Sequence, residues 1–383
     1  MKRSFSMTVA SIGMVSALFA AEGPAKKPLP VKPPWQRLLQ GADAKKTVEQ
    51  EKGLYELQEA GQFKEALEIA EALADLRAKV QGADHWQAVN AHFVVEEMHQ
   101  VLRLKQEEQQ SYSLARALQR EAYAWEAKGH YFVAQSLHEK ALSIYRKLLG
   151  EEHLRTATSY SWMTYNLAAQ GKYKEAAESF DKALVVRRKV LGEEHPDTAQ
   201  TYNDLALNLN AQGKYKEAEE NYDKALAIYR KVLGEVSLGA ATSYSGVALN
   251  LTAQGKHKEA EQDLRKALAI CRKVLGEEHP DTAQSYINLA ANLDDQGKYK
   301  EAEESYRKAL AIYRKVLGEE DPVMAHALAQ LGDNLVKQKK FTDAEPLLRQ
   351  CLAIREQKQP DEWPYLQRAF TAGRSAFGPE EVH

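Results

Sequence analysis

Amide and hydroxyl side chains recur along this chain at intervals of 42 residues, a spacing that could place them in one polar strip. Asparagine recurs at one position and glutamine four residues later, while serine or threonine stands seven residues before most of the asparagines. The asparagines are Asn166, Asn208, Asn250, Asn292 and Asn334. Such groups could hold a peptide backbone, or they could bridge neighbouring helices, because buried amides must be paired. We expect the bridging role, a structural amide ladder, because these positions do not vary as a ligand-reading surface would.

Histidines offer a second kind of chemistry, metal binding. His85, His92 and His99 lie seven residues apart, and Glu96 falls on the same face of a helix expected over residues 84–102. His92, Glu96 and His99 could coordinate zinc, but their span of two helical turns is long for a single ion. We therefore expect ordinary, partly buried histidines and neither a metal nor a cofactor. A metal-responsive helical protein is kept as an alternative.

Catalysis is not predicted by any residue pattern in this sequence. It contains no glycine-rich phosphate loop, no nucleophile elbow and no HExxH motif. Its two cysteines, Cys271 and Cys351, stand nearly two repeats apart, which in a stacked array is beyond disulfide reach. We expect both to be buried in helices, and we expect no enzymatic activity.

The elements that position these residues are defined by a repeated block. The phrase GKYKEA begins at Gly171, Gly213 and Gly297, and GKHKEA begins at Gly255, so that each step is 42 residues. A fixed period of this size indicates stacked supersecondary units that share a continuous core. Within one block, Pro196 suits the first turn of a helix and Gly213 suits a helix end, which predicts two helices per repeat.

The apolar and small residues between Tyr202 and Ala225 follow a recognisable spacing. Tyr202-x2-Leu205-Ala206-x2-Leu209, followed by Gly213-x-Tyr215 and Ala218-x3-Tyr222, resembles the tetratricopeptide repeat. The long unit and its KVLGEEHPDTA junction resemble the kinesin light chain type of this repeat, as found in bacterial proteins. The resemblance covers residues 112–357 strongly and 44–81 weakly. It implies an all-α, right-handed superhelical solenoid of antiparallel helix pairs.

The resemblance also implies a binding surface, because the first helix of each pair lines a concave groove in such arrays. The residues carried over to this groove, which would bind the partner, are Gln200, Asn203, Asp204, Asn210, Ser245, Asn288, Asp294 and Asp295. They make a neutral to acidic surface that would favour a peptide with neutral or basic side chains.

The flanks of the array predict its organisation and its compartment. Two basic residues precede an apolar run that ends at Ala21, which is typical of a secretory signal peptide and predicts export to the periplasm or the medium. The segments expected along the chain are a signal peptide (1–21), an extended Pro/Lys-rich linker (22–43), a divergent N-terminal repeat (44–81), an extra helical segment (82–111), the repeat array (112–357) and a C-terminal partial repeat or tail (358–383).

The net charge of −2 gives no reason to expect nucleic acid or, after removal of the signal, a membrane as partner. We expect a non-catalytic scaffold for protein–protein interaction that binds an unidentified protein or peptide, and self-association is left open. The alternative is a regulatory or sensory arm of an enzyme system, as a truncated relative of repeat proteins that carry a protease-like or kinase domain.

Overall fold

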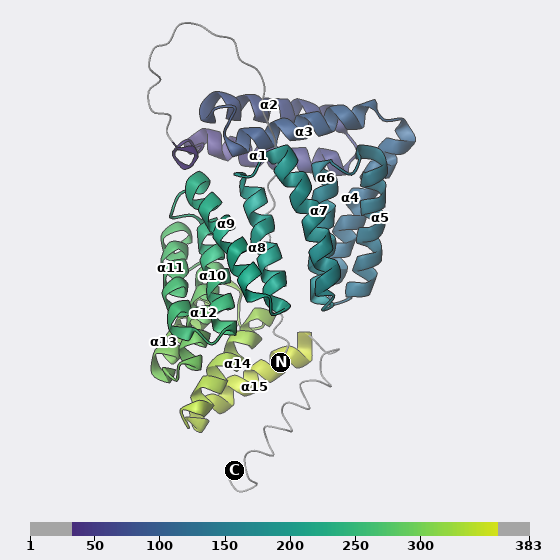
Figure 1. The fold of residues 1–383 in the computed structure, drawn as a ribbon. Coiled ribbons are helices and arrows are strands. Elements are labelled where there is room, and N and C mark those ends of the chain that lie inside the picture. The colour runs from purple at the N-terminus through teal and green to yellow at the C-terminus, as the bar shows by residue number, and fades with distance from the viewer. Residues whose placement is uncertain (1–32, 359–383) are drawn as a thin grey trace, which may run out of the picture. The chain divides into compact units, whose positions relative to one another are not determined.

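The computed structural model describes residues 33–358, and every regular element in this range is helical (Figure 1). In the N-terminal part these elements are η1 Pro34–Gln36, α1 Gly41–Glu59, α2 Phe63–Gln81, α3 Trp86–Arg103, α4 Gln106–Glu126 and α5 Tyr131–Leu149. They continue with α6 Leu154–Ala169, α7 Tyr173–Leu191, α8 Pro196–Ala211, α9 Tyr215–Leu233 and α10 Leu238–Ala253. The remainder are α11 His257–Leu275, α12 Pro280–Asp295, α13 Tyr299–Val316, α14 Pro322–Lys337 and α15 Phe341–Lys358. Helices that follow one another pack in pairs, which confirms the expected all-α solenoid.

Two compact units make up the fold, and their boundary lies inside α10, between Gly246 and Val247. The first unit holds η1, the helices α1–α9 and the start of α10, and the second holds the rest of α10 and α11–α15. The core of the second unit is continuous across its repeats and includes Ala260, Tyr306 and Leu328. No helix within residues 33–358 combines the length and the apolar character needed to cross a bilayer.

One repeat, α8 with α9, shows how the local sequence produces a helix pair. His195 caps α8, because its Nδ1 accepts a hydrogen bond from the backbone N–H of Asp197 at 3.1 Å, and Pro196 follows as the first helical residue. The turn to α9 uses Gly213 with φ of 75°, a left-handed conformation that costs glycine nothing. The inner face of α9 then buries small and aromatic side chains, among them Ala218 and Tyr222.

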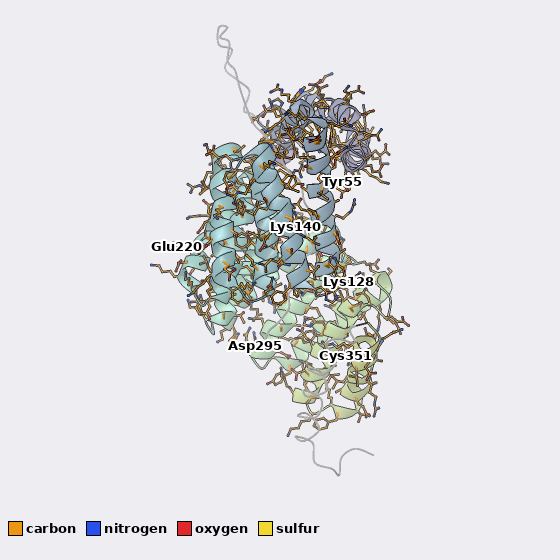
Figure 2. All side chains as sticks on the ribbon, turned by 90° about the vertical axis from the view of Figure 1, so that its right-hand side faces the viewer. Tyr55, Lys128, Lys140, Glu220, Asp295 and Cys351 are labelled. Atoms are coloured by element: carbon orange, nitrogen blue, oxygen red, sulfur yellow. The ribbon has the colours of Figure 1, made fainter. Side chains whose placement is uncertain are left out.

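The outer faces of the second helices carry charge. Glu220 of α9 and Lys140 of α5 are both exposed, and Figure 2 shows Glu220 pointing away from the helices. Ion pairs that are exposed on both sides, such as Arg349 with Glu345 of α15 at 2.6 Å, contribute roughly 0–1 kcal/mol each. The stability of the array therefore depends on the buried faces rather than on these charges.

The N-terminal helices depart from the segments expected from sequence. The extra helix exists as α3, but α4 begins at Gln106, so the expected boundary at residues 111 and 112 falls inside it and is wrong. The side chain of Glu108 accepts from the backbone N–H of Lys105 at 3.0 Å and so starts α4 early. The linker boundary at residue 43 is wrong as well, since α1 already begins at Gly41. The signal peptide, the linker up to residue 32 and the tail from residue 359 lie outside the described residues.

The helix α3 packs across the repeats rather than in line with them. Figure 1 shows α2 and α3 side by side, running across α6 and α7. Phe93 of α3 joins the apolar cluster that contains Leu154 and Ala157 of α6 and Val186 of α7. The ring of Phe93 also meets that of His153 edge to face, with centroids 5.6 Å apart.

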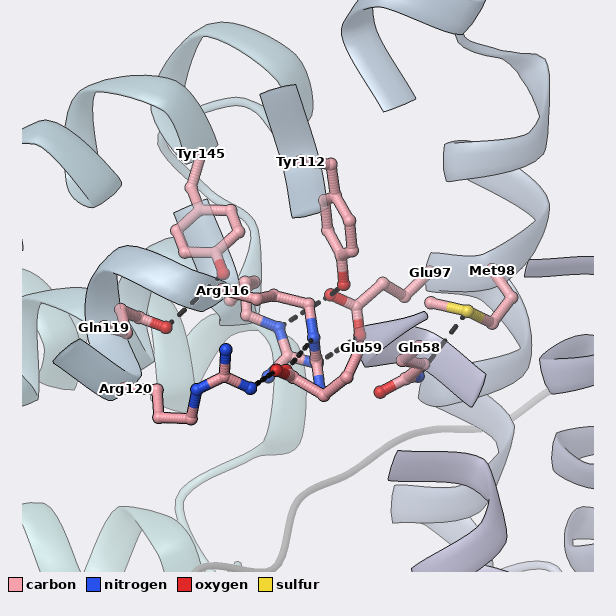
Figure 3. A network of polar contacts seen from close by, with 10 residues as sticks. Gln58, Glu59, Glu97, Met98, Tyr112, Arg116, Gln119, Arg120 and Tyr145 are labelled. Carbon is pink, nitrogen blue, oxygen red and sulfur yellow. Dashed lines mark hydrogen bonds and ion pairs between the residues drawn. The ribbon is translucent and has the colours of Figure 1, made fainter. Parts of the chain in front are cut away.

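A buried polar network fastens these N-terminal helices together (Figure 3). Glu97 of α3 accepts two hydrogen bonds from Arg155 of α6, at 2.7 and 2.6 Å, and one from the hydroxyl of Tyr112 of α4, at 2.9 Å. Glu59 of α1 pairs with two arginines of α4, including Arg116 at 3.1 Å. Burial alone would raise the pKa of Glu97, but the charge and hydrogen bonds of Arg155 outweigh it and lower the pKa to about 2.

Candidate functional site

A row of aromatic side chains lies along the first helices of the first unit. Tyr123 of α4 meets Trp162 of α6 edge to face, and Trp162 meets Tyr165 in the same way, with centroids 6.2 Å apart in both pairs. Tyr123 is 57% exposed, and the other two side chains are half-buried. Large aromatic side chains that are held in place but accessible are suited to contacts with a partner.

The last ring of the row, Tyr165, is hydrogen-bonded to polar side chains of α8. The hydroxyl of Tyr165 donates to Oδ2 of Asp204 at 2.6 Å, and the amide of Gln200 donates to Oδ1 of the same carboxyl at 2.8 Å. The hydroxyl of Tyr229 in turn donates to Oε1 of Gln200 at 3.1 Å. Burial raises the pKa of Asp204 to about 6, against the opposing effect of these hydrogen bonds. The carboxyl thus belongs to an internal network that holds the aromatic row in position.

Three of the residues expected to face a ligand are buried instead, which corrects their assignment to a free surface. Asp204 is bonded as just described, and Asn203 accepts from the hydroxyl of Ser243 on α10 at 3.0 Å. In the second unit, Asp294 accepts from the amide of Asn334 at 2.5 Å and from Lys337 at 3.4 Å. The physical reason is that successive first helices pack closely enough for these side chains to bond across the gap.

The other expected groove residues are at least partly accessible. Exposure is intermediate for Gln200, Asn210, Ser245 and Asn288, and Asp295 is exposed. In the first unit, Asn210 has a side-chain oxygen that is buried without a hydrogen-bond partner. In the second unit, Asn288 accepts from Gln284 at 2.9 Å, and the carboxyl of Asp295 lies 3.9 Å from the ring of His257. Their binding role stays a prediction.

The five ladder asparagines are all buried. In the first unit, Asn166 donates to the carbonyl of Tyr131, the first residue of the preceding second helix, at 3.0 Å. In the second unit, Asn334 makes the same bond to the carbonyl of Tyr299, also at 3.0 Å. The glutamine four residues later closes on each asparagine, as Gln338 does at 2.8 Å. The bonds of Asn166 and Asn334 to the tyrosine carbonyls join neighbouring repeats, as the ladder requires, whereas the amide nitrogen of Asn208 is buried without a hydrogen-bond partner.

The histidines act mainly at helix ends. His85, His153, His195 and His279 each accept a backbone N–H two residues later and so cap α3, α6, α8 and α12. His92 and His99 are exposed and lie 3.4 Å from Glu96 and 3.7 Å from Glu71. Among residues 33–358, no group of three or more His, Cys, Asp or Glu side chains is placed to hold a metal ion.

The aromatic row was missed by the sequence reasoning, although a signal for it was present. Trp162 stands one repeat before Asp204, and Tyr123 stands one repeat before Tyr165, at the same 42-residue step. Carrying the position of Asp204 one repeat toward the N-terminus would therefore have found Trp162, and the same step links Tyr123 to Tyr165.

Two models described as tetratricopeptide repeat match the chain, one at residues 164–231, 239–315 and 294–357 and the other at residues 114–155. The chain thus belongs to the tetratricopeptide repeat proteins, whose fold generally serves as a non-catalytic scaffold for protein–protein interaction. No curated protein sequence matches it at a significant level.

Solved structures of kinesin light chain-like repeats are similar to this chain. A putative kinesin light chain from Podosopora anserina with nearly identical TPR-like repeats is 28% identical over 54% of this chain and 97% of that chain, with a TM-score of 0.46. BtubC (BKLC) from P. vanneervenii is 23% identical over 58% of this chain and 89% of that chain, with a TM-score of 0.50. Aspartyl phosphate phosphatase F from Bacillus subtilis is 12% identical over 83% of this chain and 95% of that chain, with a TM-score of 0.50.

Proposed function

We propose that this protein is a non-catalytic scaffold that binds a protein or peptide segment on the first-helix face of its repeats. The observation that carries the proposal is the row formed by Tyr123, Trp162 and Tyr165. Each ring touches the next, and the last is anchored by its hydrogen bond to the buried carboxyl of Asp204. The row is therefore held in place before any partner arrives, which lowers the entropic cost of binding.

Polar groups on the first helices of each unit determine which ligand that unit would suit. On α8 of the first unit, Asn210 carries a half-buried amide group, and amides can bond an extended peptide backbone, whereas the amide of Gln200 is already bonded to Asp204 and Tyr229. In the second unit, the exposed carboxyl of Asp295 favours neutral or basic side chains. The burial of Asp204 and Asp294 leaves the preference for basic ligands weaker than the sequence had indicated.

Affinity capture of the mature protein from its native cells, followed by mass spectrometry, tests this proposal when matched variants are compared. Tyr123→Ala should reduce recovery of the bound partner at least several-fold, because it removes the most exposed ring of the row. The control is Phe132→Ala, which removes a 76% exposed ring on the second helix α5. Equal loss of the partner from both variants, or loss from Phe132→Ala alone, would place the binding surface elsewhere. Circular dichroism melts should be unchanged in both.

We further propose that the protein is exported, on the strength of the basic start and the apolar run before Ala21. Both free cysteines in residues 33–358, Cys271 and Cys351, are buried. Neither thiol is therefore exposed to oxidation in an oxidising compartment.

A further inference from the structure

The segment before α1 lies against the repeats of the first unit. The helix η1 contacts α9, and the residue that follows it, Arg37, reaches the turn between α2 and α3. Nη1 of Arg37 donates to the backbone carbonyl of Gln81 at 2.6 Å. Nη1 and Nη2 of Arg37 also donate to the two carboxylate oxygens of Asp84, at 2.8 and 2.9 Å. The guanidinium is thus held in the paired geometry that distinguishes arginine from lysine.

The turn is shaped to receive this group. Gly82 has φ of 93°, and a Cβ at this position would stand 2.7 Å from Nη1 of Arg37. Nε2 of His85 lies 3.1 Å from the carbonyl oxygen of Pro34, and Nδ1 of the same ring accepts a hydrogen bond from the backbone N–H of Gln87. That second bond requires Nδ1 to be unprotonated, so the neutral ring carries its proton on Nε2 and donates it to Pro34.

The regular repeats explain why this turn needs a cation from elsewhere. At each of three later junctions, the acidic residue just before the junction histidine pairs with a lysine from the following second helix. These pairs are Glu152 with Lys189, Glu194 with Lys231 and Glu278 with Lys315. Asp84 occupies the same position before His85, but its partner is Arg37, which comes from the N-terminal segment instead. Asp84 therefore receives its cationic partner from a segment that lies outside the repeats.

We propose that the turn formed by Gln81, Gly82, Asp84 and His85 is a peptide-recognition site for an arginine that stands three residues after a proline, at the end of a short helical turn. The residues Pro34–Arg37 are its resident ligand, and a segment of the same chemistry supplied in trans takes their place when they leave. This site is separate from the aromatic row, so the proposal does not depend on the function argued above.

Exchange is physically reasonable because the acceptor side of the ion pair is open to solvent. The carboxylate of Asp84 is 71% exposed although the Arg37 side chain is only 14% exposed, so an incoming guanidinium can reach the carboxylate, and solvent weakens the pair on that side. Only residues 38–40 separate Arg37 from α1, so the resident segment competes mainly through its high effective concentration. Removing the resident arginine should accordingly open the site to an external peptide.

Binding in trans is measured by fluorescence anisotropy with a labelled synthetic peptide of residues 28–40 and the full-length protein. Wild type should bind it weakly, and Arg37→Ala should bind it at least tenfold more tightly because the site is vacated. Adding Asp84→Asn to Arg37→Ala should abolish that gain, and so should replacing the arginine in the peptide. Gln36→Ala, which changes an exposed neighbour of Arg37, should behave as wild type. An Arg37→Ala protein that melts normally and binds no better than wild type would overturn the proposal.

Occupancy by the resident segment is measured separately by limited trypsin cleavage followed by mass spectrometry. Cleavage between Arg37 and Leu38 should be slow in wild type and at least fivefold faster in Asp84→Asn, because the freed guanidinium can enter the protease. Cleavage after Arg103, at the end of α3, should not change between the two proteins and serves as the internal control. Equal cleavage after Arg37 in wild type and Asp84→Asn would show that the segment is not held by this turn.

Discussion

Arg155 donates two hydrogen bonds to the buried carboxylate of Glu97, and this pair joins α6 of the repeat array to α3, which crosses it. The carboxylate also accepts from Tyr112, so its oxygens are bonded from two different helices. Glu97 is buried, whereas Arg155 retains a quarter of its side-chain exposure. The relationship makes the N-terminal helices dependent on a charge pair that spans 58 residues of sequence.

Glu97→Gln should destabilise the protein by about 3 kcal/mol, because it leaves the charge of Arg155 without a partner in a largely buried position. Urea unfolding followed by circular dichroism measures the loss. The control is Glu96→Gln on the same helix, whose carboxyl is 61% exposed and should matter by less than about 0.5 kcal/mol. Similar losses of unfolding free energy in the two variants would show that the buried pair stabilises the protein no more than an exposed carboxylate does.

Asn334→Leu should cost about 1–3 kcal/mol, because it leaves the carbonyl of Tyr299 and the carboxyl of Asp294 without the amide that bonds them. Asn221→Leu is the matched control, since the amide of Asn221 bonds a carbonyl of its own helix. Partner binding should be unchanged in both variants under conditions where they are fully folded. Normal stability of Asn334→Leu combined with lost binding would instead assign the amide ladder to ligand recognition.

Gly246→Ala should destabilise the first unit by roughly 1–2 kcal/mol, although alanine is the better helix former. The added Cβ would stand 2.2 Å from Cε1 of Tyr222, a contact that forces repacking. Gly53→Ala, where the nearest atom is 3.7 Å away in Ile69, should be neutral or stabilising. In a Tyr222→Leu background, which copies Leu264 one repeat later, the cost of Gly246→Ala should shrink, and a thermal double-mutant cycle measures this coupling.

Acid should destabilise the protein in part through His195. Burial lowers the pKa of His195 to about 3, while the unfolded chain titrates near 6.5. The unfolded state therefore binds more protons below pH 6.5, so that this residue's contribution is complete above that pH and falls as the pH drops. The loss should reach about 2 kcal/mol by pH 5.

The test is the free energy of unfolding of His195→Asn from pH 7.5 to pH 5. Asparagine keeps the helix cap but does not titrate, so this variant should lose less stability in acid than wild type. His279→Asn replaces the same kind of cap at a ring that is 40% exposed and controls for the cap itself. An acid dependence of His195→Asn as steep as that of wild type would contradict the assignment.

The mature protein should begin near Ala21 or Glu22, as the basic start and apolar run predict. N-terminal sequencing of protein from its native cells checks this. Retention of Met1 would exclude export by a cleaved signal peptide.

The repeats themselves were readable from the sequence because their determinants are local. Pro196 and Gly213 bound α8 as expected, and the inner stripe of α9 that includes Tyr222 is buried as its spacing predicted. Each of these features depends on residues within one or two helical turns, and the 42-residue period repeats the same local signals several times. A helix pair and its register follow directly from such signals.

The functional surfaces were decided by tertiary structure, because they depend on side chains that meet from distant positions. The resemblance to tetratricopeptide repeats placed Asp204 on the groove, but the approach of α6 buries it under the hydroxyl of Tyr165, 39 residues away. Nothing local to residues 34–37 indicates that Arg37 reaches Asp84, 47 residues later. The 42-residue period is interrupted after Gly82, so the sequence did not predict that α3 crosses α6. The sequence thus determined the repeating unit, whereas the packing of one unit on the next decided which polar groups stay free to bind.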